Sequence, residues 1–194
     1  MSAEQNRIVA LLFLLGAAGA IWYWSTTTGG QTAIGNTVDN LNAVLSGTSR
    51  GIRNNNPGNI VRNNIQWQGA LTEAQVQALG WTWDPTFVQF DTPLNGLRAL
   101  GRILLVYASR GDNSVDALIS TYAPPAENDT AAYELAVANA IGVNEGATIN
   151  VPQELGQIMA AVVQHENQQP GTQWVDPYGQ SLYVEAIAAA SQNS

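Results

Sequence analysis

The sequence predicts a mainly α-helical protein of the α+β class, with one small extended region and an apolar segment before the folded part. Segments of helical character, bounded by capping residues, glycine or proline, fill most of the chain after residue 92. One stretch, 81–91, alternates aromatic and polar residues, which is typical of extended structure. Residues 8–24 carry no charge.

The apolar segment 8–24 reads IVALLFLLGAAGAIWYW. A helix of this length is about 26 Å long, enough for a thin bilayer, and Trp22, Tyr23 and Trp24 suit an interfacial belt. We therefore expect residues 1–24 to be a single-pass anchor, with the C-terminal part on the outer, periplasmic side because Arg7 precedes the span. The alternatives are a secretory signal cleaved near 18–20 and a helix buried in the soluble domain.

Small polar residues and glycine dominate residues 25–49, which we expect to be a flexible tether with one short helix at most. The folded domain is then expected over residues 50–194. The sequence contains no internal repeat.

The first elements of this domain are short. Residues 72–80 form a predicted helix, because Thr72 and Gln75 match a capping box and Gly80 suits the stop. The extended stretch 81–91 follows, and Pro85 limits it to the edge of any sheet.

Five further helices are predicted from apolar spacing and end signals. The longest have apolar residues every three or four positions, and Pro152 falls in a first turn, where proline is tolerated. Asn128 or Asp129 is the expected cap of the third helix. Their ranges are 93–111, 113–123, 128–142, 151–167 and 179–192.

Composition excludes several classes of function. Net charge is −8, lysine is absent, and the seven arginines lie between residues 7 and 110, so we expect no nucleic-acid partner. The chain has no cysteine and a single histidine, His165, which argues against thiolate chemistry and a Cys or His metal site. We expect no metal and no cofactor, and chemistry that rests on carboxylates, amides and aromatic rings.

Glu166 is the acid whose position stands out. It follows Leu155 by eleven residues, which at about 100° per residue places it on the apolar stripe of the helix 151–167. Apolar surroundings and the negative helix end would both raise its pKa, as a general acid requires. The alternative is that the helix frays before residue 166 and Glu166 lies in solvent. His165 points about 100° away from it and is expected to be a boundary residue.

Tryptophan and asparagine are frequent in the domain, as in sugar-binding clefts, where rings stack on pyranose faces and amides bind hydroxyl and N-acetyl groups. Trp67 is a candidate of this kind. The run Asn54-Asn55-Asn56-Pro57-Gly58-Asn59 is expected to form a tight polar turn of type II at Pro57-Gly58.

Four segments resemble a known family. GIRNNNPGNI (51–60), WQG (67–69), FVQFDTPLNGLRAL (87–100) and STYAPPAENDTAAY (120–133) are similar to phage virion-associated proteins with a lysozyme-like, lytic-transglycosylase-related domain. The similarity covers about residues 50–190, and the first segment is the most specific. It implies a lysozyme-like domain in which one glutamate protonates the glycosidic oxygen and the substrate N-acetyl group assists. Intramolecular attack then yields an anhydro sugar without a second carboxylate.

The resemblance also implies site residues. Glu166 would be the acid, although ENQQP stands where the family has glycine after EN, and Tyr122 would be the tyrosine beside it. The remaining residues expected to bind substrate are Asn55, Asn56, Asn59, Trp67, Asn128 and Tyr133.

The implied function is cleavage of the MurNAc-GlcNAc β-1,4 bond of peptidoglycan during phage genome delivery, by transglycosylation or hydrolysis. The implied partners are glycan strands, a membrane through residues 8–24, and other virion proteins. The alternative is a non-catalytic structural or ejection-channel protein with the same fold. Glu73 is the next candidate for the acid.

Overall fold

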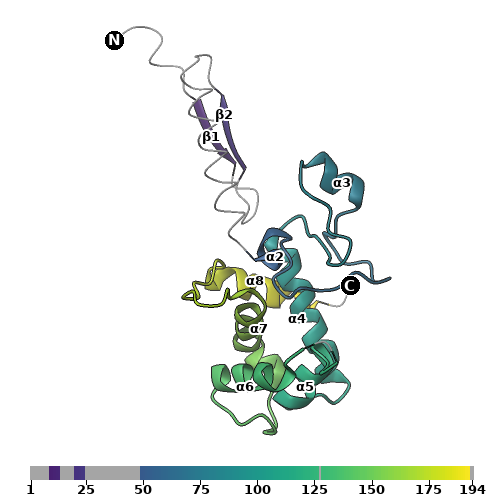
Figure 1. Ribbon diagram of the computed structural model, residues 1–194, viewed down its shortest axis with the longest axis vertical. Coiled ribbons are helices and arrows are strands. Elements are labelled where there is room, and N and C mark those ends of the chain that lie inside the picture. The colour runs from purple at the N-terminus through teal and green to yellow at the C-terminus, as the bar shows by residue number, and fades with distance from the viewer. Residues whose placement is uncertain (1–8, 14–19, 25–48, 127, 193–194) are drawn as a thin grey trace. The chain divides into compact units, whose positions relative to one another are not determined.

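A computed structural model describes residues 9–13, 20–24, 49–126 and 128–192 of the chain (Figure 1). Chain contacts divide the protein into two compact units, Met1–Ser49 and Arg50–Ser194. Each unit is considered by itself below.

The first unit contains two antiparallel strands, β1 (Val9–Phe13) and β2 (Ala20–Trp24), paired from Val9 with Trp24 to Phe13 with Ala20. The helix predicted over 8–24 is therefore not formed in these two stretches, while residues 8 and 14–19 lie outside the described residues. Short apolar runs suit strands as well as helices, and periodicity does not separate the two. Among the described residues, no helix has the length and apolar character to cross a bilayer. Residues 25–48 of the predicted tether, 25–49, also lie outside them.

The second unit is mainly helical, as predicted. Its helices are α2 (Arg50–Arg53), α3 (Glu73–Ala78), α4 (Pro93–Ser109), α5 (Val115–Tyr122), α6 (Thr130–Ile141), α7 (Val151–Asn167) and α8 (Gln180–Ser191). Helix α4 packs against α5, α7 and α8, and α6 packs against α5 and α7 (Figure 1). The C-terminal end of α7 contacts α2, which brings the start of the unit to the helix that carries Glu166.

Local signals account for the helix ends. Thr72 and Gln75 form the predicted capping box of α3, and Asp129 accepts a hydrogen bond from the Ala132 N–H at the start of α6. Gly142 ends α6 in the left-handed conformation, with φ of 74°. Helix termination by such short-range contacts explains why the predicted ranges agree with the structure to within a few residues.

The extended region differs from its prediction. Residues 81–91 contain no regular strand, only the isolated bridges Val61–Phe87 and Ala70–Phe90. The segment after Pro85 is nevertheless paired on both sides: Val88 N–H donates to Ile60 C=O, and Asp91 N–H donates to Gly69 C=O. The segment is therefore central and not an edge. Pro85 does not prevent this pairing, because it precedes the paired residues and removes no N–H donor from them.

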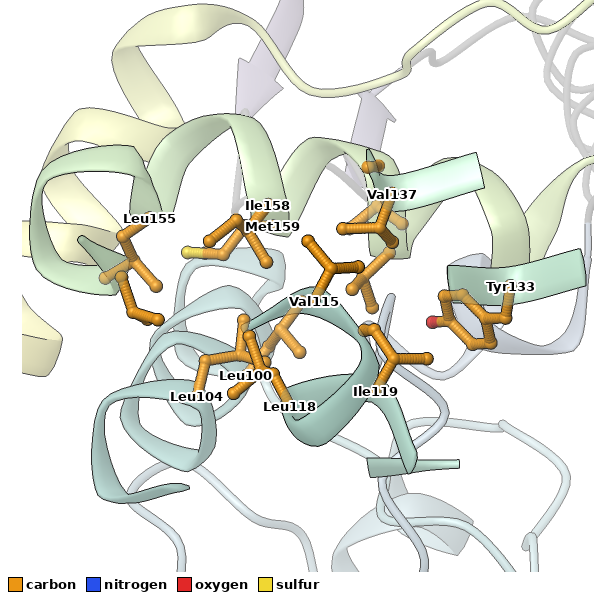
Figure 2. Packing of buried hydrophobic residues seen from close by; sticks show 14 of the residues in the cluster. Leu100, Leu104, Val115, Leu118, Ile119, Tyr133, Val137, Leu155, Ile158 and Met159 are labelled. Atoms are coloured by element: carbon orange, nitrogen blue, oxygen red, sulfur yellow. The ribbon is translucent and has the colours of Figure 1, made fainter. Parts of the chain in front are cut away.

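The main hydrophobic core lies between α4, α5, α6 and α7 (Figure 2). Its fully buried side chains include Leu100 and Leu104 from α4, Leu118 from α5, and Leu155 and Ile158 from α7. Each such side chain contributes about 1.5–3 kcal/mol on burial, so this core holds the four helices in one arrangement. Tyr133 lies at one edge of the cluster (Figure 2).

A second, smaller cluster lies beneath the extended region and contains Ile60, Val88, Phe90 and Ala99. It anchors the asparagine-rich segment and the central extended segment to α4. The two clusters together fix the loop 54–60 relative to α7.

Candidate active site

A pocket of about 560 Å³ opens between the asparagine-rich loop, the extended segment and helices α4, α5 and α7. Its walls combine amide groups, backbone and aromatic or aliphatic side chains. The lining residues are Gly58, Asn59, Ile60, Val61, Asn63, Thr86, Phe87, Ile103, Tyr107, Tyr122, Ala123, Pro124, Asn128 and Glu166.

Glu166 reaches this pocket from the last turn of α7, which continues to Asn167. The fraying alternative is therefore wrong, and the carboxyl group is held by two neutral donors. Asn59 Nδ2 donates to Oε2 at 2.8 Å, and the Tyr133 hydroxyl donates to Oε1 at 3.0 Å. Both contacts use side chains that are distant in the sequence, so α7 alone does not orient the acid.

Burial raises the pKa of Glu166 above its ordinary value, and the hydrogen bonds from Asn59 and Tyr133 offset part of this rise. The sequence predicts the same direction. Burial, followed by the charge of Glu166, raises the pKa of Tyr133 and Tyr122 well above 10. Both tyrosines are consequently neutral hydroxyls at pH 7, and Tyr133 can donate to the carboxylate.

Asn59 owes its position to an unusual backbone. It has φ of 47°, a left-handed conformation that asparagine tolerates better than most residues. Its amide packs beside Gly51, where an added Cβ would approach Asn59 Oδ1 to 2.7 Å and Asn167 Oδ1 to 2.5 Å. Glycine at position 51 is thus needed for the loop to lie against α7.

Asn167, which sequence reasoning missed, ties the same loop to the helix end. Its amide donates to Pro57 C=O at 2.7 Å and to Val163 C=O at 2.8 Å, and the residue is buried. The available signal for Asn167 was its position directly after Glu166 at the predicted end of the helix, where a polar side chain that becomes buried must find hydrogen-bond partners.

Some asparagines of the run bind the backbone of neighbouring segments, and one reaches the pocket. Asn55 donates to Phe90 C=O, and Asn56 donates to Ile60 C=O and Val88 C=O while accepting from Ile60 N–H. Both residues are buried, and neither lines the pocket. Their amides satisfy the backbone of the extended segments, so of the three predicted asparagines only Asn59 reaches the cleft.

The turn itself forms, with Asn59 N–H donating to Asn56 C=O at 2.9 Å. It is not the predicted type II turn, because Gly58 lacks the positive φ that this type requires. Glycine is needed there for space instead: an added Cβ would lie 2.6 Å from the Tyr122 hydroxyl oxygen. The Tyr122 hydroxyl donates to Gly58 C=O, which places Tyr122 in the pocket wall.

The other predicted residues are spread out. Asn128 lines the pocket and donates to Pro124 C=O at 3.3 Å. Tyr133 lies behind Glu166, with 1% of its surface exposed. Trp67 packs against the second cluster and is not among the lining residues. Glu73 is exposed on α3 and accepts from Gln77, outside the pocket.

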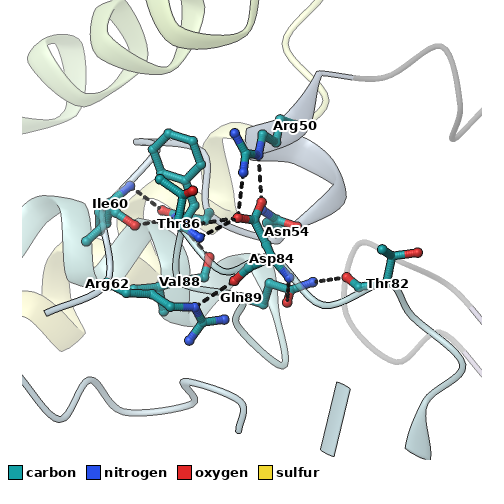
Figure 3. A network of polar contacts seen from close by, with 11 residues as sticks. Arg50, Asn54, Ile60, Arg62, Thr82, Asp84, Thr86, Val88 and Gln89 are labelled. Atoms are coloured by element: carbon teal, nitrogen blue, oxygen red, sulfur yellow. Dashed lines mark hydrogen bonds and ion pairs between the residues drawn. The ribbon is translucent and has the colours of Figure 1, made fainter. Parts of the chain in front are cut away.

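A second carboxylate, which sequence reasoning also missed, organises the extended region (Figure 3). Asp84 accepts two hydrogen bonds of 2.7 Å from the Arg50 guanidinium and one of 2.7 Å from Asn54. The N–H groups of Thr86 and Phe87 add two more. The Asp-Pro pair at 84–85, a turn-initiating dipeptide, was the available signal.

Comparison with known proteins places the chain in a viral context. No family model matches it. It is 36% identical over 127 residues to Protein P5 of Pseudoalteromonas phage PM2, and the matched region covers 63% of this chain and 74% of that protein.

Proposed function

Since this chain belongs to the family of Protein P5 of Pseudoalteromonas phage PM2, we propose that it is a virion-associated enzyme that cleaves peptidoglycan. The proposed reaction breaks the MurNAc-GlcNAc β-1,4 bond, by lytic transglycosylation, while the phage delivers its genome. The second unit would be a lysozyme-like domain.

One observation carries this proposal: a carboxyl group with a raised pKa faces a pocket of about 560 Å³. A general acid must be protonated near neutral pH and must reach the leaving oxygen, and burial of Glu166 promotes the first condition. Its place in the pocket wall supports the second.

The walls of the pocket suit an amino sugar. Phe87, Tyr107 and Tyr122 offer apolar surface for pyranose faces, while the amides of Asn63 and Asn128 can bind hydroxyl and N-acetyl groups. This mixture of rings and amides is the observation that favours a glycan over an unmodified peptide.

In the proposed step Glu166 gives its proton to the glycosidic oxygen, and the bond from that oxygen to C1 of MurNAc breaks. The N-acetyl oxygen of the same sugar stabilises C1. The C6 hydroxyl then bonds to C1 and returns its proton to Glu166, leaving a 1,6-anhydro end. Asn59 and Tyr133 stabilise the carboxylate that exists between the two proton transfers.

The number of acids separates this route from ordinary hydrolysis. Hydrolases that use two carboxylates place them roughly 5–9.5 Å apart across the scissile bond. Among the described residues that line the pocket, Glu166 is the one acid. A mechanism in which the substrate supplies the second group therefore fits this pocket better.

Membrane attachment through residues 8–24 is part of the proposal and rests on their uncharged, apolar sequence. Flotation of the full chain with lipid vesicles tests it. We expect the full chain to float and a variant with Leu11, Leu12 and Leu14 changed to aspartate to stay at the bottom of the gradient.

The central experiment compares the wild type with Glu166→Gln on purified sacculi. We expect the rate of turbidity loss to fall by about 10²–10⁴-fold, because the amide has no acidic proton to transfer to the glycosidic oxygen. Glu73→Gln is the matched control, since this exposed carboxylate lies outside the pocket. Circular dichroism and thermal unfolding establish that both variants are folded.

Mass spectrometry of the released fragments identifies the reaction. Anhydromuropeptides support transglycosylation, and reducing muramic ends indicate a hydrolase. An absence of released fragments would favour the structural role. Full activity in Glu166→Gln would contradict the assignment of the acid.

A further inference from the structure

The aromatic rings behind Glu166 form a stack that the proposed reaction does not by itself require. The His165 and Tyr133 rings lie face to face, with centroids 3.7 Å apart and planes inclined by 13°. Tyr122 meets the Tyr133 ring edge-on, with centroids 6.5 Å apart at 85°. The Tyr133 ring thus packs against two other aromatic rings.

The stack and the acid share one side chain. Tyr133 comes from α6, while His165 and Glu166 are adjacent on α7, so one helix supplies both the surface that supports the tyrosine ring and the acceptor of its hydroxyl. The hydroxyl lies 3.0 Å from Glu166 Oε1. A shift of the ring along or away from α7 would lengthen this hydrogen bond.

Exposure shows which partner covers the other. Tyr133 has 1% of its surface exposed, whereas His165 belongs to the exposed residues of α7. The imidazole therefore lies on one face of a buried ring and is itself open to solvent. The side chain of an exposed histidine could instead extend into solvent. The residue that makes this contact immediately precedes the acid, Glu166, on α7.

We infer that His165 is a positioning residue: its imidazole holds the Tyr133 ring so that the tyrosine hydroxyl stays on Glu166. The inference rests on the proposed function for its catalytic meaning, while the geometry that it describes is independent of any substrate. His165 itself is not among the residues that line the pocket.

The charge state of the imidazole agrees with this role. Although His165 is exposed, partial burial of its ring lowers the pKa of the imidazole, and the charge of Asp129 offsets part of the change. The ring is then neutral at pH 7 and stacks on Tyr133 without placing a cation beside Glu166. Asp129 is the charged group that acts on the imidazole, and Tyr133 is the ionisable side chain stacked on it.

The first test measures the pKa of Glu166 directly, by ¹³C NMR of the side-chain carboxyl group in the full chain. The Tyr133 hydrogen bond favours the ionised acid, so we expect the pKa to rise further in Tyr133→Phe and in His165→Ala. The two changes together should give little more than either alone, because they remove the same contact. His165→Phe restores a flat ring and should return the pKa toward the wild-type value.

Kinetics on sacculi provide the second readout. We expect His165→Ala to lower kcat on the order of tenfold with little change in KM, since misplacement of a reacting group affects the chemical step more than binding. Gln164→Ala is the matched control: Gln164 is the preceding exposed residue of α7 and bonds to Gln168 instead. It should leave both the pKa and kcat unchanged.

The outcomes separate the two proposals. An unchanged Glu166 pKa in His165→Ala, with a raised pKa in Tyr133→Phe, would overturn the positioning role whatever the activity. Failure of His165→Phe to restore the pKa would also overturn it. If both variants raise the pKa of Glu166 but the wild-type protein releases no fragments from sacculi, the positioning role of His165 is supported and the proposed function is overturned.

Discussion

Glu166 and Asp84 are both withdrawn from water, yet their surroundings push their pKa values in opposite directions. Around Glu166, burial dominates and two neutral donors offset it only in part, so the pKa rises. Around Asp84, burial acts in the same upward direction, but Arg50, Phe87, Asn54 and Thr86 together outweigh it and hold the pKa well below its usual range. The number and charge of the donors decide the protonation state of a buried carboxyl group.

The difference separates two tasks within one domain. Asp84 is 7% exposed and joins α2 to the extended segment, with Arg50 also lying over the Phe87 ring at 4.5 Å and Arg62 over the Trp83 ring at 3.7 Å. A carboxylate that is ionised at neutral pH and held by several donors is suited to holding structure. Glu166 keeps a proton more readily and faces a pocket, which is suited to proton transfer.

The largest effect on stability is expected from Asp84→Asn. The asparagine amide lacks the negative charge that pairs with Arg50. Its NH₂ group would also face the N–H donors that now bind the carboxylate. Since Arg50 is half-exposed, we expect a loss of about 2–3 kcal/mol rather than the larger cost of breaking a fully buried pair. Urea unfolding measures it, and Glu73→Gln should change the free energy by less than about 0.5 kcal/mol. A loss in Asp84→Asn as small as that of the control would contradict the structural role.

The stability difference between the wild type and Asp84→Asn should depend on pH. Because the folded-state pKa of Asp84 is depressed, its contribution is present above the unfolded pKa of about 3.9 and is lost as pH falls through the folded value. Unfolding between pH 3 and pH 7 should show a constant gap above about pH 5 that narrows below about pH 4. If the difference in unfolding free energy between the two proteins widens in acid, the pKa of Asp84 is not depressed in the folded state.

Glu166→Gln should have the opposite and smaller effect on stability. A carboxyl with a raised folded-state pKa favours the folded state at low pH and loses this contribution as pH rises through that value. The amide can still accept from Asn59, while the Tyr133 hydroxyl can rotate to accept from it. We expect a gain of about 0.5–1 kcal/mol at pH 7 that disappears near pH 4. Thermal unfolding at both pH values checks the sign.

The smallest effect on stability is expected from Asn59→Gly, which removes one donor to Glu166 while keeping a residue that tolerates φ of 47°. The pKa of Glu166 should rise, because the lost hydrogen bond favoured the ionised form. Carboxyl ¹³C titration measures the direction. A pKa that falls would mean that Asn59 does not stabilise the carboxylate.

Much of the helical domain could be predicted from sequence because its determinants are local. Capping at Thr72 and Asp129, the glycine that ends α6, and the apolar stripe of α7 each involve residues within a few positions of one another. The same stripe placed Glu166 against apolar surroundings before any fold was known. The function of Glu166 as an acid, the lysozyme-like architecture and the membrane anchor stay predictions.

The rest depended on contacts between distant segments. Asn59 and Glu166 are separated by 107 positions, and Tyr133 and Glu166 by 33. The sequence pattern marked Asn59, Tyr133 and Glu166 as site residues but did not show that they meet. It also gave Asn55 and Asn56 the same role as Asn59. Only the tertiary structure shows that Asn55 and Asn56 bind backbone carbonyls, whereas Asn59 binds the acid.

The sequence by itself determined where helices α3 to α8 lie and that one carboxylate would fall on an apolar face, since both follow from short-range hydrogen bonding and the 3.6-residue repeat. Tertiary structure alone decided which donors meet that carboxylate, that His165 covers the Tyr133 ring, and that Asp84 is ionised within a network of donors. The physical reason is that a pKa depends on burial and on the charges and donors brought near the group, and these come from residues far apart along the chain.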